Sequence, residues 1–166
     1  TKLILFELSE LALYNIDMEL RQLAEGSGVE VVPVLGTVTD SRQLRKVLAE
    51  HSVNVILHAA AYKHVPLVEA NPLSGLVNNV LGTQTLAEQA ARAGVERFIL
   101  ISTDKAVRPA NIMGGSKRLA ELVVQDMTRK YGGPGGVIFS MVRLGNVLGS
   151  SGSVVPLVQG RPTRLI

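Results

Sequence analysis

The chain has 166 residues, 46% of them hydrophobic, and no cysteine, which suits one globular domain and excludes disulfides and thiolate metal sites. Its formal charge of +3 comes from Lys and Arg residues that are scattered rather than clustered, so we expect no nucleic-acid partner. No run of 18 apolar residues occurs and the three histidines have no ligand spacing, so neither a membrane span nor a metal site is predicted in this segment.

Short apolar runs alternate along the chain with longer stretches of helical periodicity. The runs predict strands at about 2–7, 30–35, 53–58, 97–102 and 137–143. Helices are predicted after each of the first four strands, at about 9–26, 40–50, 72–94 and 111–132. This alternation is typical of a Rossmann-like α/β fold, a doubly wound parallel sheet with helices on both faces.

One part of a dinucleotide-binding fold is missing from the sequence. Such a fold needs a first strand and a glycine-rich turn that holds the pyrophosphate at a helix N-terminus. No G-x-G-x-x-G pattern precedes Glu7, and the chain opens with Thr1 directly on a strand. We therefore expect an internal fragment whose first strand and glycine-rich turn lie upstream.

Ligands of such sheets bind at the carboxyl ends of the strands, where this chain places mostly polar or small residues. An acid after the first strand can accept both ribose hydroxyls and repel a 2′-phosphate, which favours NAD over NADP; a helix-capping acid is the equal alternative. An adenine edge can sit after the second strand. Alanines after the third strand either admit a cofactor closely or fill a core. The candidate cofactor contacts from this reasoning are Glu7, Ser9, Thr37, Val38, Ala59, Ala60 and Ala61.

An acid and an amine stand side by side just past the fourth strand. Asp104 and Lys105 can supply a proton donor and a proton acceptor to one substrate, and a loop ion pair is the simpler interpretation. In the helix that follows, Met113 and Lys117 are four residues apart and share a face.

Several blocks of sequence carry a family resemblance. They are residues 6–10, 58–66, 79–83, 101–109, 111–121 and 143–156. In this order they resemble bacterial UDP-N-acetylglucosamine 4,6-dehydratases, the polysaccharide-biosynthesis enzymes of the extended short-chain dehydrogenase superfamily. The resemblance implies a partial NAD-binding Rossmann domain with the start of a nucleotide-sugar site at 1–157. Residues 158–166 are a tail that does not resemble the family, and we expect them to be joined to the preceding residues across a missing part of the substrate lobe.

The resemblance implies a lyase that oxidises, dehydrates and reduces UDP-N-acetylglucosamine around a retained NAD. It makes Asp104 the acid and Lys105 the base, which requires a closed, substrate-filled site that keeps the acid protonated and the amine neutral. Thr103 would bond the sugar 4-hydroxyl, and Lys117 the nicotinamide ribose. Met113 replaces the usual Tyr base, so a water or Thr103 must relay the 4-hydroxyl proton. Asn79 and Ser102 are further expected cofactor contacts, and Lys63, Asn146, Ser150, Ser153 and Val154 are expected to bind substrate.

Two enzymatic alternatives and one non-enzymatic alternative remain open from the sequence. The enzyme could invert carbon 5 during dehydration or be a simple 4-epimerase, although an epimerase needs no acid-base pair for losing water. Met113 favours the third possibility, a catalytically silent dinucleotide-binding module. Met is also normal in the membrane-anchored subgroup, so the resemblance implies a homo-oligomeric, cytoplasmic domain of an inner-membrane protein whose membrane anchor lies outside this segment.

Overall fold

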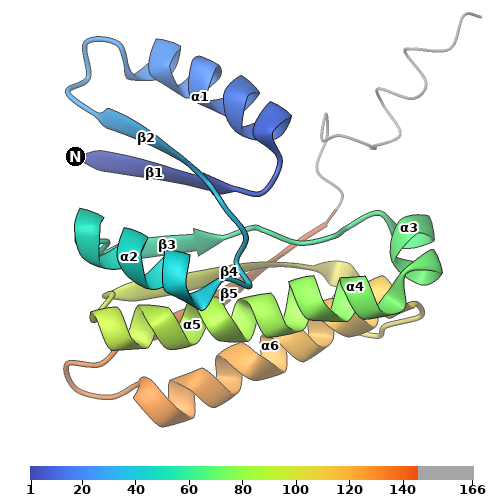
Figure 1. Cartoon of the computed structure of the whole chain (residues 1–166). Helices are drawn as coiled ribbons and strands as arrows, with labels where there is room; N and C mark the ends of the chain where they lie inside the picture. The colour runs from blue at the N-terminus through green and yellow to red at the C-terminus, as the bar shows by residue number, and fades with distance from the viewer. Residues whose placement is uncertain (146–166) are drawn as a thin grey trace, which may run out of the picture.

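The computed structural model describes residues 1–145 and shows parallel strands covered by helices (Figure 1). The strands are β1 (Lys2–Glu7), β2 (Glu30–Leu35), β3 (Val55–His58), β4 (Arg97–Thr103) and β5 (Ile138–Leu144). All strand pairs are parallel, β1 with β2 and β4 with both β3 and β5. The predicted Rossmann-like class is confirmed. The third strand begins two residues later than predicted.

The helices lie on two sides of the strands, with α1 on one side and α2, α5 and α6 on the other (Figure 1). All four predicted helices are present, the third as α4, η1 and α5; the short elements α3 and η2 and the π-helical interruption of the third helix were not predicted. The helical elements are α1 (Glu10–Ala24), α2 (Ser41–His51), α3 (Val65–Ala70), α4 (Pro72–Leu76), the π-helical η1 (Val77–Leu81), α5 (Gly82–Ala93), the 3₁₀ turn η2 (Asp104–Ala106) and α6 (Ile112–Tyr131).

Side-chain caps fix where three of these helices begin. Ser9 Oγ accepts the backbone N–H of Ala12 at the start of α1. Asp40, rather than Ser41, caps α2 by accepting two backbone N–H groups. Asn111 Oδ1 accepts the N–H of Gly114 at 2.8 Å and starts α6. Each cap satisfies donors that the first helical turn leaves without a partner.

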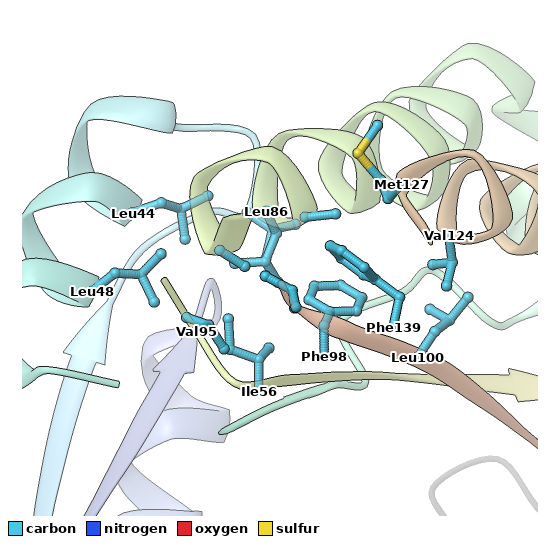
Figure 2. Packing of buried hydrophobic residues seen from close by; sticks show 14 of the residues in the cluster. Leu44, Leu48, Ile56, Leu86, Val95, Phe98, Leu100, Val124, Met127 and Phe139 are labelled. Atoms are coloured by element: carbon cyan, nitrogen blue, oxygen red, sulfur yellow. The ribbon is translucent and has the colours of Figure 1, made fainter. Parts of the chain in front are cut away.

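The main hydrophobic core lies between the three-stranded sheet and the helices α2, α5 and α6 (Figure 2). Phe98 and Leu100 of β4 are fully buried, and Phe98 packs against Phe139 of β5 with ring centroids 5.5 Å apart. Ala87 and Ala120 are also fully buried, and their small side chains allow close helix packing. The opposite face of this sheet is less covered, with Leu57 68% and Ile138 60% exposed.

The five strands divide between two sheets, although the alternation in the sequence predicted one. Within residues 1–145, β1 pairs only with β2, and β3 pairs only with β4. Each of these two strands therefore has one edge without a strand partner. The physical reason for the division is that no described strand lies between them to join the two hydrogen-bonded ladders.

A buried histidine closes β3 on the core side. His58 is 2% exposed, and its Nε2 lies 2.8 Å from Thr83 Oγ1. Because Thr83 donates its own hydrogen to Asn79 O, the ring must donate from Nε2. Burial, with a smaller contribution from the charge of Lys117, lowers the pKa of His58 to about 3. The imidazole is therefore neutral at physiological pH.

A glycine sets the distance between α6 and the end of β4. A Cβ placed on Gly114 would lie 2.6 Å from the backbone oxygen of Lys105, which is closer than real Cβ contacts. The neighbouring Gly115 has open space at the same position. The turn η2 can therefore rest directly on the first turn of α6 only because residue 114 has no side chain.

Because the pKa of His58 is lowered in the folded protein, we expect the free energy of unfolding to fall on mild acidification. Its folded pKa lies below the unfolded value near 6.5, so the unfolded chain binds more protons below that pH. The stabilisation is fully present above about pH 6.5 and falls by up to about 1.4 kcal/mol per pH unit towards about pH 3. Urea unfolding between pH 7 and 5 measures this slope. His58→Gln keeps a donor for Thr83 but does not titrate, so its slope should be shallower; equal slopes would contradict the assignment.

We expect alanine substitutions at the two neighbouring glycines of α6 to have opposite effects on the free energy of unfolding. Gly114→Ala should lower the free energy of unfolding by about 1–3 kcal/mol, because the methyl group collides with a backbone oxygen. Gly115→Ala should raise it by up to about 1 kcal/mol, because alanine favours the helix and meets nothing. Urea unfolding of both variants tests the pair. A Gly114→Ala protein at least as stable as the wild type would show that the loop moves without cost.

Candidate active site

Thr103, Asp104 and Lys105 form a small hydrogen-bonded group at the carboxyl end of β4. Thr103 Oγ1 donates to Asp104 Oδ1 at 3.0 Å and accepts the backbone N–H of Lys105. Lys105 Nζ lies 3.3 Å from the same carboxylate oxygen. The side chains of Asp104 and Lys105 are 59% and 43% exposed, so both can be reached by a ligand.

The carboxylate of Asp104 is stabilised in its ionised form in this arrangement. The hydrogen bond from Thr103, followed by that from Lys105, holds the pKa of Asp104 below its ordinary value. A role as proton donor requires the opposite shift. Asp104 must therefore acquire a proton, or a drier environment, before it can act as an acid.

Lys117 reaches the end of β4 from the first turns of α6. It is 7% exposed, and its Nζ donates to the backbone oxygen of Ile101 at 2.7 Å. Burial lowers the pKa of Lys117 to about 8, and the charge of Glu121 partly opposes this shift. Met113, one turn earlier, is also buried.

The structure brings together the two halves of the site that the sequence predicted separately. Lys117 contacts Ile101, two residues before Thr103, and Gly114 lies against the carbonyl of Lys105. The acid-amine pair and the helix lysine therefore occupy the same end of β4. An amine, a carboxylate and a hydroxyl around one strand end can exchange protons with one bound substrate.

Asn79 uses its side-chain amide within the protein. It is 1% exposed and lies in η1, where its Nδ2 donates to Tyr62 O and to Ser116 Oγ. Its Oδ1 accepts the N–H of Tyr62 at 2.8 Å. Asn79 therefore holds the loop after β3 against α6, and its contact with a cofactor stays a prediction. A π-helical segment such as η1 often occurs at a functional site, but its position is not readable from the sequence pattern.

A pocket of ≈ 340 Å³ opens at the carboxyl ends of β1 and β2. This volume lies at the lower end for small-molecule sites, enough for part of a dinucleotide. Thr37 lines the pocket, whereas Val38 is buried in the core. The pocket lining consists of Leu8, Thr37, Thr39, Tyr62, Leu73, Ser74, Val77 and Asn78.

The remaining predicted cofactor residues have mixed environments. Glu7 accepts the backbone N–H of Ser9 at 2.8 Å, so its carboxylate caps the entry to α1, which was one of the two equal interpretations of this acid. Ser9 itself is the N-cap of that helix. Ala59 is exposed, and Ala60 and Ala61 are half-buried. Ser102 is buried, and its hydroxyl donates to Glu121, a residue that the sequence reasoning gave no role.

The predicted substrate contacts can be followed only in part. Lys63 is exposed in the loop after β3, on the side of the sheet where that strand ends. Asn146, Ser150, Ser153 and Val154 lie outside the described residues. Among residues 1–145 no group of three His, Asp or Glu side chains could hold a metal ion. None of the helices in the same range has the length and apolarity to cross a bilayer.

Comparison with known proteins gives one consistent family. The family model described as "Polysaccharide biosynthesis protein" matches residues 1–162. The capsular polysaccharide biosynthesis protein CapD of Staphylococcus aureus is 43% identical over 96% of this chain and 26% of its own length. An inverting UDP-N-acetylglucosamine 4,6-dehydratase of Campylobacter jejuni is 39% identical over 74% of this chain and 36% of its own.

The fold comparison agrees with the sequence comparison. The structure of Pen from Bacillus thuringiensis superimposes with a TM-score of 0.82 and 28% identity, over 93% of this chain and 45% of that one. The chain thus spans between about a quarter and a half of the length of these three proteins. From the family match and the shared fold, the chain belongs to the polysaccharide biosynthesis proteins of the extended short-chain dehydrogenase superfamily.

Proposed function

We propose that the protein is a lyase that dehydrates UDP-N-acetylglucosamine across carbons 5 and 6 to give a UDP-4-keto-6-deoxy sugar for surface glycan synthesis. One observation carries the proposal: the exposed pair Asp104 and Lys105 lies at the same strand end as the buried Lys117. The name of the Campylobacter relative supports the reaction and the substrate. The chain's own acid-amine pair supports elimination over simple epimerisation, which needs no acid for a departing water.

The proposed cofactor is NAD, which when bound would accept a hydride from sugar carbon 4 and return it to carbon 6. The pocket lined by Thr37 is the proposed place of the adenosine, and Lys117, which now binds Ile101, would turn to a ribose hydroxyl. The carboxylate of Glu7 stands after β1 and supports NAD over NADP, although one of its oxygens already binds Ser9.

The proton steps can be assigned to the chain's own residues. Oxidation at carbon 4 releases the hydroxyl proton, and Thr103 can pass it on because its hydroxyl already donates to Asp104. Asp104 then carries the proton that the departing 6-hydroxyl takes as water leaves, while Lys105 removes the proton from carbon 5. When carbon 6 is reduced, Lys105 returns its proton to carbon 5. Every proton in these steps is assigned without Met113, whose thioether cannot give or take a proton. A water in place of Thr103 is the alternative relay.

The domain around the site is proposed to contain one more strand between β1 and β3. Both strands have an edge without a strand partner among the described residues, and the pairing order β2, β1, gap, β3, β4, β5 matches a doubly wound sheet whose central strand is absent. That strand and its glycine-rich turn would come from upstream of residue 1. Residues 1–157 would then belong to the NAD-binding domain and 158–166 to a tail that continues towards the substrate lobe.

The whole protein is proposed to be a homo-oligomeric cytoplasmic domain attached to the inner membrane by segments outside residues 1–166. The family resemblance supports the attachment. An apolar groove between α5 and α6, lined by Leu119, Leu122 and Val123, supports association of copies.

Leu122→Asp should lower the mass found by sedimentation velocity, whereas Leu67→Asp, on α3, should not. A wild-type mass of one protomer would refute the association.

Turnover in heavy water tests the proposed reaction. The full-length protein with UDP-N-acetylglucosamine in D₂O should give a 4-keto-6-deoxy product with one deuterium at carbon 5, and denaturation should release NAD. Mass spectrometry and NMR measure the product, and the proton couplings of carbon 5 show whether it was inverted. Release of NADP would contradict the cofactor assignment. Formation of the 4-epimer would favour the epimerase, and binding of both ligands without conversion would favour a silent module.

Lys105→Ala should reduce product formation by at least about 100-fold, because it removes the base that takes the carbon 5 proton. NAD should still be bound, since Lys105 is not among the proposed cofactor contacts. Lys46→Ala, which removes an exposed amine of α2, serves as the control and should leave turnover unchanged. Near-normal turnover by the Lys105 variant would assign the base role to another group.

A further inference from the structure

Glu121 on α6 is a fully buried carboxylate with partners from three elements. Its side chain is 0% exposed. Ser102 of β4 donates to its Oε1 at 2.7 Å. Arg143 of β5 binds both oxygens, at 2.8 Å from Nε and 2.7 Å from Nη2. Arg118, one turn earlier on α6, donates to Oε2 at 2.9 Å.

This set of partners keeps Glu121 charged and fixed in orientation. Burying a carboxylate costs free energy unless its oxygens are fully hydrogen-bonded, and here each of the two oxygens accepts two bonds. The bonds from Arg143, with those from Ser102 and Arg118, lower the pKa of Glu121 to about 2 although burial opposes the shift. The two parallel bonds to Arg143 also define the plane of the carboxylate, which a single ion pair would not do.

The partners of Glu121 lie at the same level of the sheet as the candidate site. Ser102 and Arg143 are paired residues of neighbouring strands. Ser102 directly precedes Thr103 and Asp104, and Arg143 lies near the end of β5. The carboxylate therefore ties the ends of β4 and β5 to α6, where the chain changes from sheet to site loop.

The link becomes more important if Lys117 turns towards a cofactor. In the structure α6 is held to β4 by two side-chain bonds, from Lys117 to Ile101 and from Ser102 to Glu121. A lysine that binds a ribose must give up Ile101. The bond from Ser102 to Glu121 would then be the side-chain connection that still holds the helix to the end of the strand.

We propose that Glu121 is a positioning residue, whose carboxylate holds the ends of β4 and β5 against α6 so that Thr103, Asp104 and Lys105 face the substrate. It does not touch the reacting atoms and acts through Ser102 and Arg143. This role rests on the proposed dehydration. It adds to that function a residue whose contribution is the geometry of the acid-base pair.

The experiment compares turnover with folding in the full-length protein. Glu121→Gln should lower kcat by about 10- to 100-fold, because small displacements of reacting groups are costly. The KM for the sugar nucleotide should change by less than about threefold, since the substrate contacts remain. Ser102→Ala should also lower kcat, and the double variant should lose little more than Glu121→Gln alone, because the two side chains act as one unit. Asp17→Asn, which breaks a carboxylate–Arg21 pair on α1, is the matched control and should leave kcat unchanged.

The outcomes separate this inference from the proposed function. Product from the wild type, with reduced kcat in the folded Glu121 variant and a non-additive double variant, supports the positioning role. A variant whose activity falls only in proportion to its folded fraction, or whose kcat stays within about twofold of the wild type, overturns it. A wild-type protein that forms no 4-keto product overturns the proposed dehydration, and this role with it.

Discussion

The position of α6 against the carboxyl end of β4 is the constraint on which the candidate site depends. Gly114, Lys117 and Glu121 are spaced by three and four residues, so they lie on one face of the helix. Gly114 meets the carbonyl of Lys105, Lys117 binds Ile101, and Glu121 binds Ser102. Successive turns of one helix thus contact residues at, or just past, one strand end. A shift of the helix along the strand would break all three contacts together.

The charged groups near this contact fall into two classes that differ in burial. Lys117 and Glu121 are buried; burial lowers the pKa of Lys117, and bonds from Arg143, Ser102 and Arg118 lower that of Glu121. Asp104 and Lys105 are exposed, and Asp104 binds its chain neighbours Thr103 and Lys105. A ligand that covers the second pair changes its environment greatly, whereas Glu121 stays buried among its own partners. Geometry can therefore stay constant while the acid and the base change their protonation states.

The sequence predicted the regular parts of this arrangement well because they follow from periodicity and capping. The five strands, the four main helices and the cap at Ser9 are local features that the chain encodes directly. The buried network around Asn79 could not be predicted, since its partners Tyr62 and Ser116 come from distant elements. Glu121 lies inside one of the sequence blocks that resemble the family, but its partner Arg143 is close to it only in the folded chain.

The predicted cofactor contacts show what cannot be inferred from a residue's position after a strand. Thr37 lines a pocket as expected, but Val38, its neighbour, points into the core. Both residues lie in the turn that the bond from the Asp40 N–H to Thr37 O closes after β2, and the sequence does not say which side chain of such a turn faces the ligand. Glu7 shows a related ambiguity, because a carboxylate that caps a helix and one that binds a ribose occupy the same position after a strand.

The ionised state of Asp104 at first contradicts its proposed role as an acid, but the order of the proton steps removes the conflict. An ionised carboxylate can accept the proton that the proposed oxidation of the 4-hydroxyl releases, whereas a protonated one cannot, and Thr103 already donates to Asp104. The lowered pKa of Asp104 therefore suits the step before elimination. Once the proton has arrived, Asp104 is neutral and can give that proton to the departing 6-hydroxyl. A single transfer through Thr103 would then prepare the acid, so the elimination has a proton donor although position 113 carries no tyrosine.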